Sequence, residues 1–157
     1  VFRLSRLGAN ISANAYYVHE LSDIYSNDSV GYERASSMAR IGTSFREGIT
    51  TTLHSDFTMA PAQPLMSMWV AVNRINEKGN LMCEEERITP QQGLEAITIS
   101  AARVLGLDHE IGSIRAGKKA DFTILEEDPL GIDPIKIKDI DIKATVFEGK
   151  VFNIKLQ

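Results

Sequence analysis

The sequence is poor in the residues from which several common kinds of site are built. Its 157 residues include a single cysteine, Cys83, and only three histidines. One cysteine can form neither an internal disulfide nor a cysteine-based zinc cluster. Cys83 also has no base near it in the sequence, which argues against a catalytic thiol. A lone thiol is compatible with a reducing compartment, and we expect a cytoplasmic location.

Long apolar runs and an excess of positive charge are missing as well. No uninterrupted apolar stretch approaches the roughly 20 residues of a membrane-spanning helix, and from the first residues given we expect no signal peptide. The formal net charge is −4, and no aromatic–basic motif is present. We therefore expect neither a membrane nor a nucleic acid as a partner. With 43% hydrophobic and 24% charged residues, the chain has the composition of a soluble globular protein with one core.

The first half of the sequence alternates between extended and helical patterns. Residues 1–30 are interpreted as a strand followed by a loop. Apolar residues at helical spacing then predict a helix over residues 33–47, although Gly42 weakens this pattern. The β-branched run at 49–54 predicts a strand. After a loop, a second apolar stripe predicts a helix over residues 65–78, which should end before a glycine.

The clearest helix start lies at Thr89. The sequence Thr89-Pro90-Gln91-Gln92 combines an N-cap residue, a proline at the first helical position and a glutamine at the capping-box position. We expect this helix to run to Leu105. Beyond it, turn-like sequences separate short β-rich segments, which cover residues 111–115, 121–125 and 144–154, with a tight hairpin turn at Glu148-Gly149. This change of pattern divides the chain into a unit over residues 1–108 and a small β unit over residues 109–157.

Several other motifs are better explained without a site. Residues 112–118 have the spacing of a phosphate-binding loop, but Lys119 stands where such a loop needs Ser or Thr. A strand also follows where a phosphate site needs a helix N-terminus, so we do not predict a nucleotide site. The charged run at 84–87 is interpreted as a solvated loop rather than a cation site. We expect His19 and His109 to be ordinary surface or turn residues.

The stretch ITTTLHSDFTMAP at residues 49–61 gives the best candidate site. Its β-branched run ends in His54, Ser55 and Asp56, which are poor strand formers that often lie where a strand meets solvent or a ligand. Alternation along an extended chain would put His54 and Asp56 on one side. In parallel α/β folds the C-terminal strand ends carry the chemistry, and a carboxylate there can bind a metal and accept a proton from metal-bound water. Alternatively, Asp56 simply caps the following turn.

Taken together, these motifs resemble the C-terminal part of a metal-dependent amidohydrolase. The resemblance rests on HSDFTMAPAQPL, Arg74, the helix ERITPQQGLEAITISAARVLGL, the segment IGSIRAGKKADFTILEEDPL and the closing hairpin TVFEGKVF, in that order. The branch that it resembles contains N-substituted formamide deformylases and proteins labelled as exoenzyme regulators. The resemblance covers residues 40–154. Its most specific part is the series GSI-x-x-GK-x-ADF followed by a hairpin with G-K-V.

The resemblance implies an α/β fold in which residues 1–108 are the last strand or strands of a (β/α)8 barrel with their helices. Residues 109–157 would be the C-terminal segment of a small composite β-sandwich, with a hairpin turn at Gly117 and solvent-facing lysines beside it. Asp56 matches the aspartate at the end of the eighth strand, which contacts the metal and acts as general base toward the hydrolytic water. His54 lies where it could contact the substrate. The implied cofactor is a divalent metal, zinc, and the implied substrate is a small amide, formamide or cyclic amide whose C–N bond is hydrolysed.

The rest of that family's metal site has no counterpart in this sequence. A first-strand His-x-His pair, a bridging Lys or Glu and later-strand histidines are all missing. A hydrolytic zinc site needs three protein ligands, so one carboxylate is not expected to hold the metal. Because the chain also starts at Val1, we expect the last third of a longer enzyme, inactive by itself. It would pair with its missing N-terminal part, or with another copy through strand edges. The alternative is a non-catalytic binding or assembly module that retains the same fold.

Overall fold

Two parallel strands form the centre of the first part of the fold. The computed structural model describes residues 1–154. Strands β1 (Ile11–Asn14) and β2 (Thr51–His54) pair in parallel, with Asn14 opposite His54. Parallel strands need a long crossover, which here is helical. It contains η1 (Tyr17–Leu21), α2 (Ser22–Asp28), α3 (Tyr32–Ser36) and α4 (Ile41–Arg46), while α1 (Phe2–Arg6) precedes β1.

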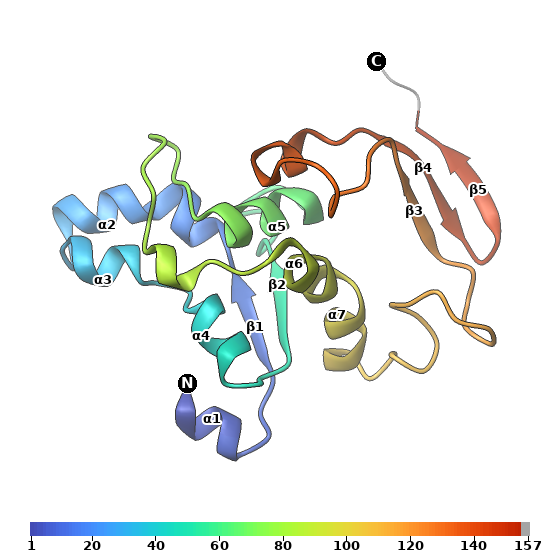
Figure 1. Cartoon of the computed structure of the whole chain (residues 1–157), viewed down its shortest axis with the longest axis horizontal. Helices are drawn as coiled ribbons and strands as arrows, with labels where there is room; N and C mark the ends of the chain where they lie inside the picture. Colours follow the sequence, from blue (N-terminus) through green and yellow to red (C-terminus); the bar gives the residue numbers. More distant parts are fainter. Residues whose placement is uncertain (155–157) are drawn as a thin grey trace.

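Strand β2 lies in the middle of the core. It is contacted by α4, α5 (Pro64–Asn73), α6 (Pro90–Ile97) and α7 (Ile99–Val104), and Figure 1 shows both strands surrounded by these helices. Leu53 of β2 belongs to the buried apolar cluster that includes Met68 and Trp69 of α5. Burial of one large apolar side chain stabilises a fold by about 1.5–3 kcal/mol. The cluster therefore fixes the strand whose end carries the candidate site.

The second sheet is antiparallel and lies to one side of the first (Figure 1). It contains β3 (Phe122–Leu125), β4 (Ile142–Phe147) and β5 (Lys150–Asn153), in the order β3-β4-β5. Between β3 and β4, η3 (Pro134–Asp139) packs on α5, where Trp69 Nε1 donates to the Ile135 carbonyl at 2.7 Å. The predicted hairpin is confirmed, because Glu148 and Gly149 have φ of 48° and 80°, as a type I′ turn requires.

Two predicted helices end early because a buried arginine binds the backbone. The helix predicted over residues 33–47 is two helices, α3 and α4, separated by Ala39 with φ of 46°. The helix predicted over 65–78 ends at Asn73, because Arg74 is left-handed with φ of 56°. The Arg74 guanidinium donates to the carbonyls of Ser36, Met38 and Ala39. One residue therefore ends α5 and holds the break between α3 and α4.

The helix predicted from Thr89 begins as expected and then kinks. Thr89 Oγ1 accepts a hydrogen bond from Gln92 N at 3.2 Å, and the Gln92 side chain accepts one from Thr89 N at 2.9 Å. Thr98 then breaks the helix into α6 and α7. Gly112 packs against this kink so closely that a Cβ on it would lie 2.6 Å from Ala102 Cβ.

Two predicted segments differ from the structure. The strand predicted at 111–115 is absent, and these residues form bends and irregular backbone. The loop predicted in the later part of residues 1–30 is wrong, because η1 and α2 cover Tyr17 to Asp28. Val18 and Ser22 in these helices are fully buried, so the packing of the crossover gives this segment a structure that its mixed apolar spacing did not indicate.

These elements confirm a mixed helix and strand architecture. The finer assignment to the end of a barrel plus part of a sandwich stays a prediction, as does the division between residues 108 and 109. The last three residues of the predicted second unit lie outside the described residues. Within residues 1–154, no helix combines the length and the apolar character needed to cross a membrane.

Candidate active site at the end of strand β2

The candidate site lies where β1 and β2 end side by side. Because the strands are parallel and Asn14 is opposite His54, both residues lie at the same edge of the sheet. Thr51 and Leu53 face the core: Thr51 Oγ1 donates to Ser44 Oγ of α4 at 2.8 Å, and Leu53 joins the apolar cluster. Alternation then turns His54 to the opposite face, and its side chain is exposed.

Asp56 lies beyond the strand, in a turn. Its φ is 53°, and its backbone carbonyl accepts a hydrogen bond from Met59 N at 2.7 Å. The expectation that strand alternation places His54 and Asp56 on one side does not apply, because the extended backbone stops at His54. Asp56 is exposed. Within residues 1–154 its carboxylate has no hydrogen bond and no ion pair, so the backbone rather than the side chain closes the turn.

Asn14 is a site residue that the sequence analysis missed. Its amide is buried and approaches the Ser55 carbonyl at 3.5 Å, one residue before Asp56. Asn14 could be recognised only from the pairing of residues 11–14 with residues 51–54, which places the polar end of β1 beside the polar end of β2. That pairing joins segments about 40 residues apart, so it cannot be read from local sequence.

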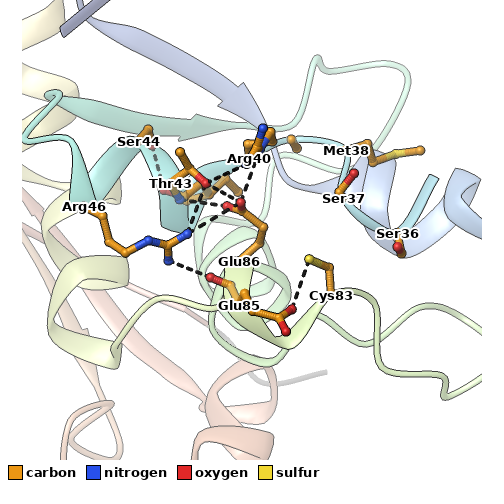
Figure 2. A network of polar contacts seen from close by, with 12 residues as sticks. Ser36, Ser37, Met38, Arg40, Thr43, Ser44, Arg46, Cys83, Glu85 and Glu86 are labelled. Carbon is orange, nitrogen blue, oxygen red and sulfur yellow. Dashed lines mark hydrogen bonds and ion pairs between the residues drawn. The ribbon is translucent and has the colours of Figure 1, made fainter. Parts of the chain in front are cut away.

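A buried polar network holds β2 from the side of α4 (Figure 2). Its centre is Glu86 in η2 (Glu84–Glu86), whose side chain is only 3% exposed. The Glu86 carboxylate accepts hydrogen bonds from Thr43 N at 2.7 Å, from Thr43 Oγ1 and from Arg40 Nε at 3.3 Å. The next residue of α4, Ser44, accepts the bond from Thr51. The network thus connects η2 through α4 to the strand that leads to the site.

Glu86 is buried, whereas the charged run at 84–87 predicted a solvated loop. The residue is buried because α4 approaches it at Gly42, where a Cβ would lie 2.8 Å from the Glu86 backbone. Burial by itself raises the pKa of the Glu86 carboxyl. The hydrogen bonds from Thr43 and Arg40 outweigh it and lower the pKa below the ordinary value of 4.5. Glu86 is therefore a buried anion that stabilises the fold in its charged form.

We predict that this carboxylate makes stability fall at acid pH. A lowered pKa in the folded state contributes stability that is present above the unfolded pKa and is lost as pH falls through the folded pKa. The free energy of unfolding in urea, measured between pH 7 and pH 3, should drop less steeply below pH 4.5 in Glu86→Gln than in the parent. Glu84→Gln, at an exposed position of the same turn, should retain the parent slope. Equal slopes in the parent and Glu86→Gln would contradict the prediction.

Three further residues have side chains of a kind that can take part in a site: Cys83, His109 and His19. Burial and a hydrogen bond to Glu85 raise the pKa of the Cys83 thiol. His109 lies 3.4 Å from Glu110 on the surface. His19 is half-buried rather than free: its Nδ1 lies 2.9 Å from the Ile75 carbonyl, and its ring meets Trp69 edge-on.

The loop at residues 112–118, which has the spacing of a phosphate-binding loop, is closed by Lys118. Lys118 Nζ donates to the Ile111 carbonyl at 3.0 Å, to Ser113 Oγ at 2.7 Å and to the Asp108 carbonyl. The expectation of solvent-facing lysines is therefore wrong for Lys118. It holds for Lys119, which is exposed and pairs with Glu110 at 2.7 Å.

The described residues do not fit a metal ion by themselves. Within residues 1–154 there is no group of three His, Cys, Asp or Glu side chains that could hold one. Asp56 offers carboxylate oxygens at an exposed strand end. A single carboxylate falls short of the three protein ligands of a hydrolytic zinc site. Asp56 can therefore supply one ligand at most, or act on a water molecule.

The chain is similar in sequence to several known proteins. The model of the amidohydrolase family matches residues 1–152. The N-substituted formamide deformylase of Arthrobacter pascens is 24% identical over 147 residues, which are 94% of this chain and 27% of that protein. The putative amidohydrolase YtcJ of Bacillus subtilis (strain 168) is 29% identical over 127 residues, which are 79% of this chain and 24% of that protein.

The fold of the chain is also similar to that of a solved structure. An uncharacterized metal-dependent hydrolase from Pyrococcus furiosus superposes with a TM-score of 0.65 and 26% identity, over 82% of this chain and 25% of that one. The chain thus spans about a quarter of the length of each of these three proteins. Since the family model covers nearly the whole sequence, the chain belongs to the amidohydrolase family.

Proposed function

We propose that this chain carries the catalytic aspartate of a metal-dependent hydrolase that cleaves C–N bonds other than peptide bonds. The observation that carries the proposal is the carboxylate of Asp56. It is exposed in the turn just after the C-terminal end of a parallel strand, and it has no hydrogen bond or ion pair within residues 1–154. The substrate class is an amide, a formamide or a cyclic amide, in keeping with the deformylase and amidohydrolase relatives.

Asp56 acts as the general base in this proposal. Its carboxylate accepts a proton from the attacking water while the water oxygen bonds to the carbonyl carbon of the substrate. As the C–N bond breaks, the same carboxyl returns the proton to the departing nitrogen, so that Asp56 is regenerated. His54, exposed beside the turn, contacts the substrate and affects its affinity.

The remaining parts of the site come from outside the described residues. We propose a divalent metal, zinc, with Asp56 as one ligand and the other ligands supplied by polypeptide beyond residues 1–154. The P. furiosus hydrolase is named metal-dependent, which supports the metal. The described residues form no metal-binding group. The other ligands are therefore assigned to polypeptide outside them.

We further propose how that polypeptide joins this chain. β1 and β2 form a two-stranded parallel sheet, and within the described residues no further strand pairs with either of its outer edges. The second sheet exposes Phe147, Val151 and Phe152, which another layer would cover. The partner is the remaining part of the same protein, which would complete a (β/α)8 barrel and a sandwich, or another copy that pairs through these strand edges.

The test of the proposed function is to compare the isolated chain with the complete enzyme. The 157-residue chain alone should neither release an amine from N-substituted formamides nor open the ring of cyclic amides, whereas the polypeptide that also supplies the other ligands should hydrolyse one of these classes. That activity should be lost on chelation and restored by zinc. Sedimentation should show the isolated chain as an oligomer. A cooperative 17.4 kDa monomer would contradict the proposed pairing, and metal-independent turnover would contradict the proposed chemistry.

A non-catalytic binding or assembly module is the second candidate. The lack of a metal-binding group within residues 1–154 favours it. The two functions differ in what the complete polypeptide does, because a module would hydrolyse no amide under any metal condition and would retain its assembly after Asp56 is replaced.

A further inference from the structure

The side chain of Asn14 contacts both ends of the turn that carries Asp56. Its Nδ2 lies 3.5 Å from the Ser55 carbonyl and 3.7 Å from Met59 Sδ. Ser55 and Met59 bracket the turn, which is closed by the bond from Met59 N to the Asp56 carbonyl. Within residues 1–154, the side-chain hydrogen bonds to residues 55–59 all come from Asn14.

Asn14 is itself held in one orientation. It is 6% exposed, and its Oδ1 accepts a hydrogen bond from Tyr16 N at 3.0 Å. The carbonyl side of the amide is therefore directed to its own strand end, and the NH₂ side to the turn after β2. Because an asparagine amide has distinct donor and acceptor ends, these partners determine which end faces Ser55.

The turn needs such support because its backbone is strained. Asp56 has φ of 53° and Thr58 has φ of 111°. Left-handed conformations of residues other than glycine cost on the order of 1 kcal/mol or more, and they persist only where the surroundings hold them. Within residues 1–154, the hydrogen bond that this turn's backbone accepts from a side chain of another element comes from the amide of Asn14.

We propose that Asn14 is a positioning residue for Asp56. It fixes the turn so that the carboxylate is presented to the substrate in one geometry. This inference rests on the proposed function of Asp56 as general base. A displacement of a catalytic group by about 1 Å can cost as much as a hundredfold in rate, so loss of the amide should appear in kcat.

The test uses Asn14→Asp in the complete enzyme. Aspartate retains an oxygen for Tyr16 N but replaces the NH₂ group with a second acceptor, which cannot bond the Ser55 carbonyl. We expect kcat to fall between ten- and a hundredfold with KM little changed. In ¹⁵N-labelled protein, the amide signals of Asp56 and Thr58 should shift. Asn10→Asp is the matched control, because it makes the same charge change at an exposed position just before the other end of β1 and should leave kcat and these signals unchanged.

The outcomes separate this inference from the proposed function. Parent kcat in Asn14→Asp, together with an inactive Asp56→Asn, would overturn the role of Asn14 and leave Asp56 as the base. Full activity in Asp56→Asn would overturn the proposed function. In that case the amide signals of Asp56 and Thr58 in Asn14→Asp would still test whether Asn14 holds the turn. Unshifted signals would show that it does not. If Asn14→Asp unfolds, Asn14→Ser provides an uncharged donor, and it should give an intermediate kcat at a retained unfolding midpoint.

Discussion

Replacement of Asp56 with asparagine is expected to remove most of the turnover of the complete enzyme without unfolding it. The amide has the shape of the carboxylate but cannot accept a proton from water, and a general base typically contributes about 10²–10⁴-fold to the rate. The fold should tolerate the change, because the Asp56 side chain is exposed and has no hydrogen-bond partner within residues 1–154. Asparagine also adopts the left-handed backbone of this position readily. The measurements are kcat and the midpoint of unfolding.

His54→Ala is the variant to be compared with Asp56→Asn. His54 is exposed two residues before Asp56, on the strand itself. Its loss should raise KM or change substrate preference while the metal content stays at the parent level. Parent turnover in Asp56→Asn would remove the general-base assignment. Equal loss of metal in both variants would make His54 a ligand instead of a substrate contact.

Replacement of Arg74 with methionine is expected to cause a large loss of stability. Arg74 is fully buried, and its guanidinium donates to four backbone carbonyls: those of Met82 at 2.9 Å, Ser36 at 2.6 Å, Met38 at 3.0 Å and Ala39 at 3.1 Å. Burial lowers the pKa of Arg74 to about 10, so it remains charged at neutral pH. Methionine would leave these carbonyls without their donor. We expect the free energy of unfolding to fall by about 3 kcal/mol or more.

Two variants test the reason for that loss. Arg74→Lys retains the positive charge but not the planar fork, so it should reach fewer carbonyls and lose an intermediate amount of stability. Arg115→Met removes an exposed arginine and should change the free energy of unfolding by less than about 0.5 kcal/mol. Chemical denaturation provides all three values. A loss in Arg74→Met no larger than that in Arg115→Met would show that the carbonyl contacts contribute nothing.

Local sequence determined the elements whose cause lies within a few residues. The capping box at Thr89 and Gln92 and the turn at Glu148-Gly149 form as predicted, because each depends on hydrogen bonds and φ angles of adjacent residues. The strand before His54 also forms, since its β-branched run favours extended backbone wherever it is buried. The position of Asp56 just after this strand was therefore readable from the sequence alone.

Tertiary structure decided what depends on contacts between distant segments. The helix breaks before Ile41 and after Asn73 follow from one buried guanidinium that binds carbonyls about 35 residues away, and no periodicity of apolar residues can indicate such a contact. The kink at Thr98 lies against Gly112 of a later loop. Asn14 joins the site only because β1 and β2 pair in register. Local sequence gives each residue its own preference, but only the packed chain determines which buried polar groups meet and where the backbone must bend to satisfy them.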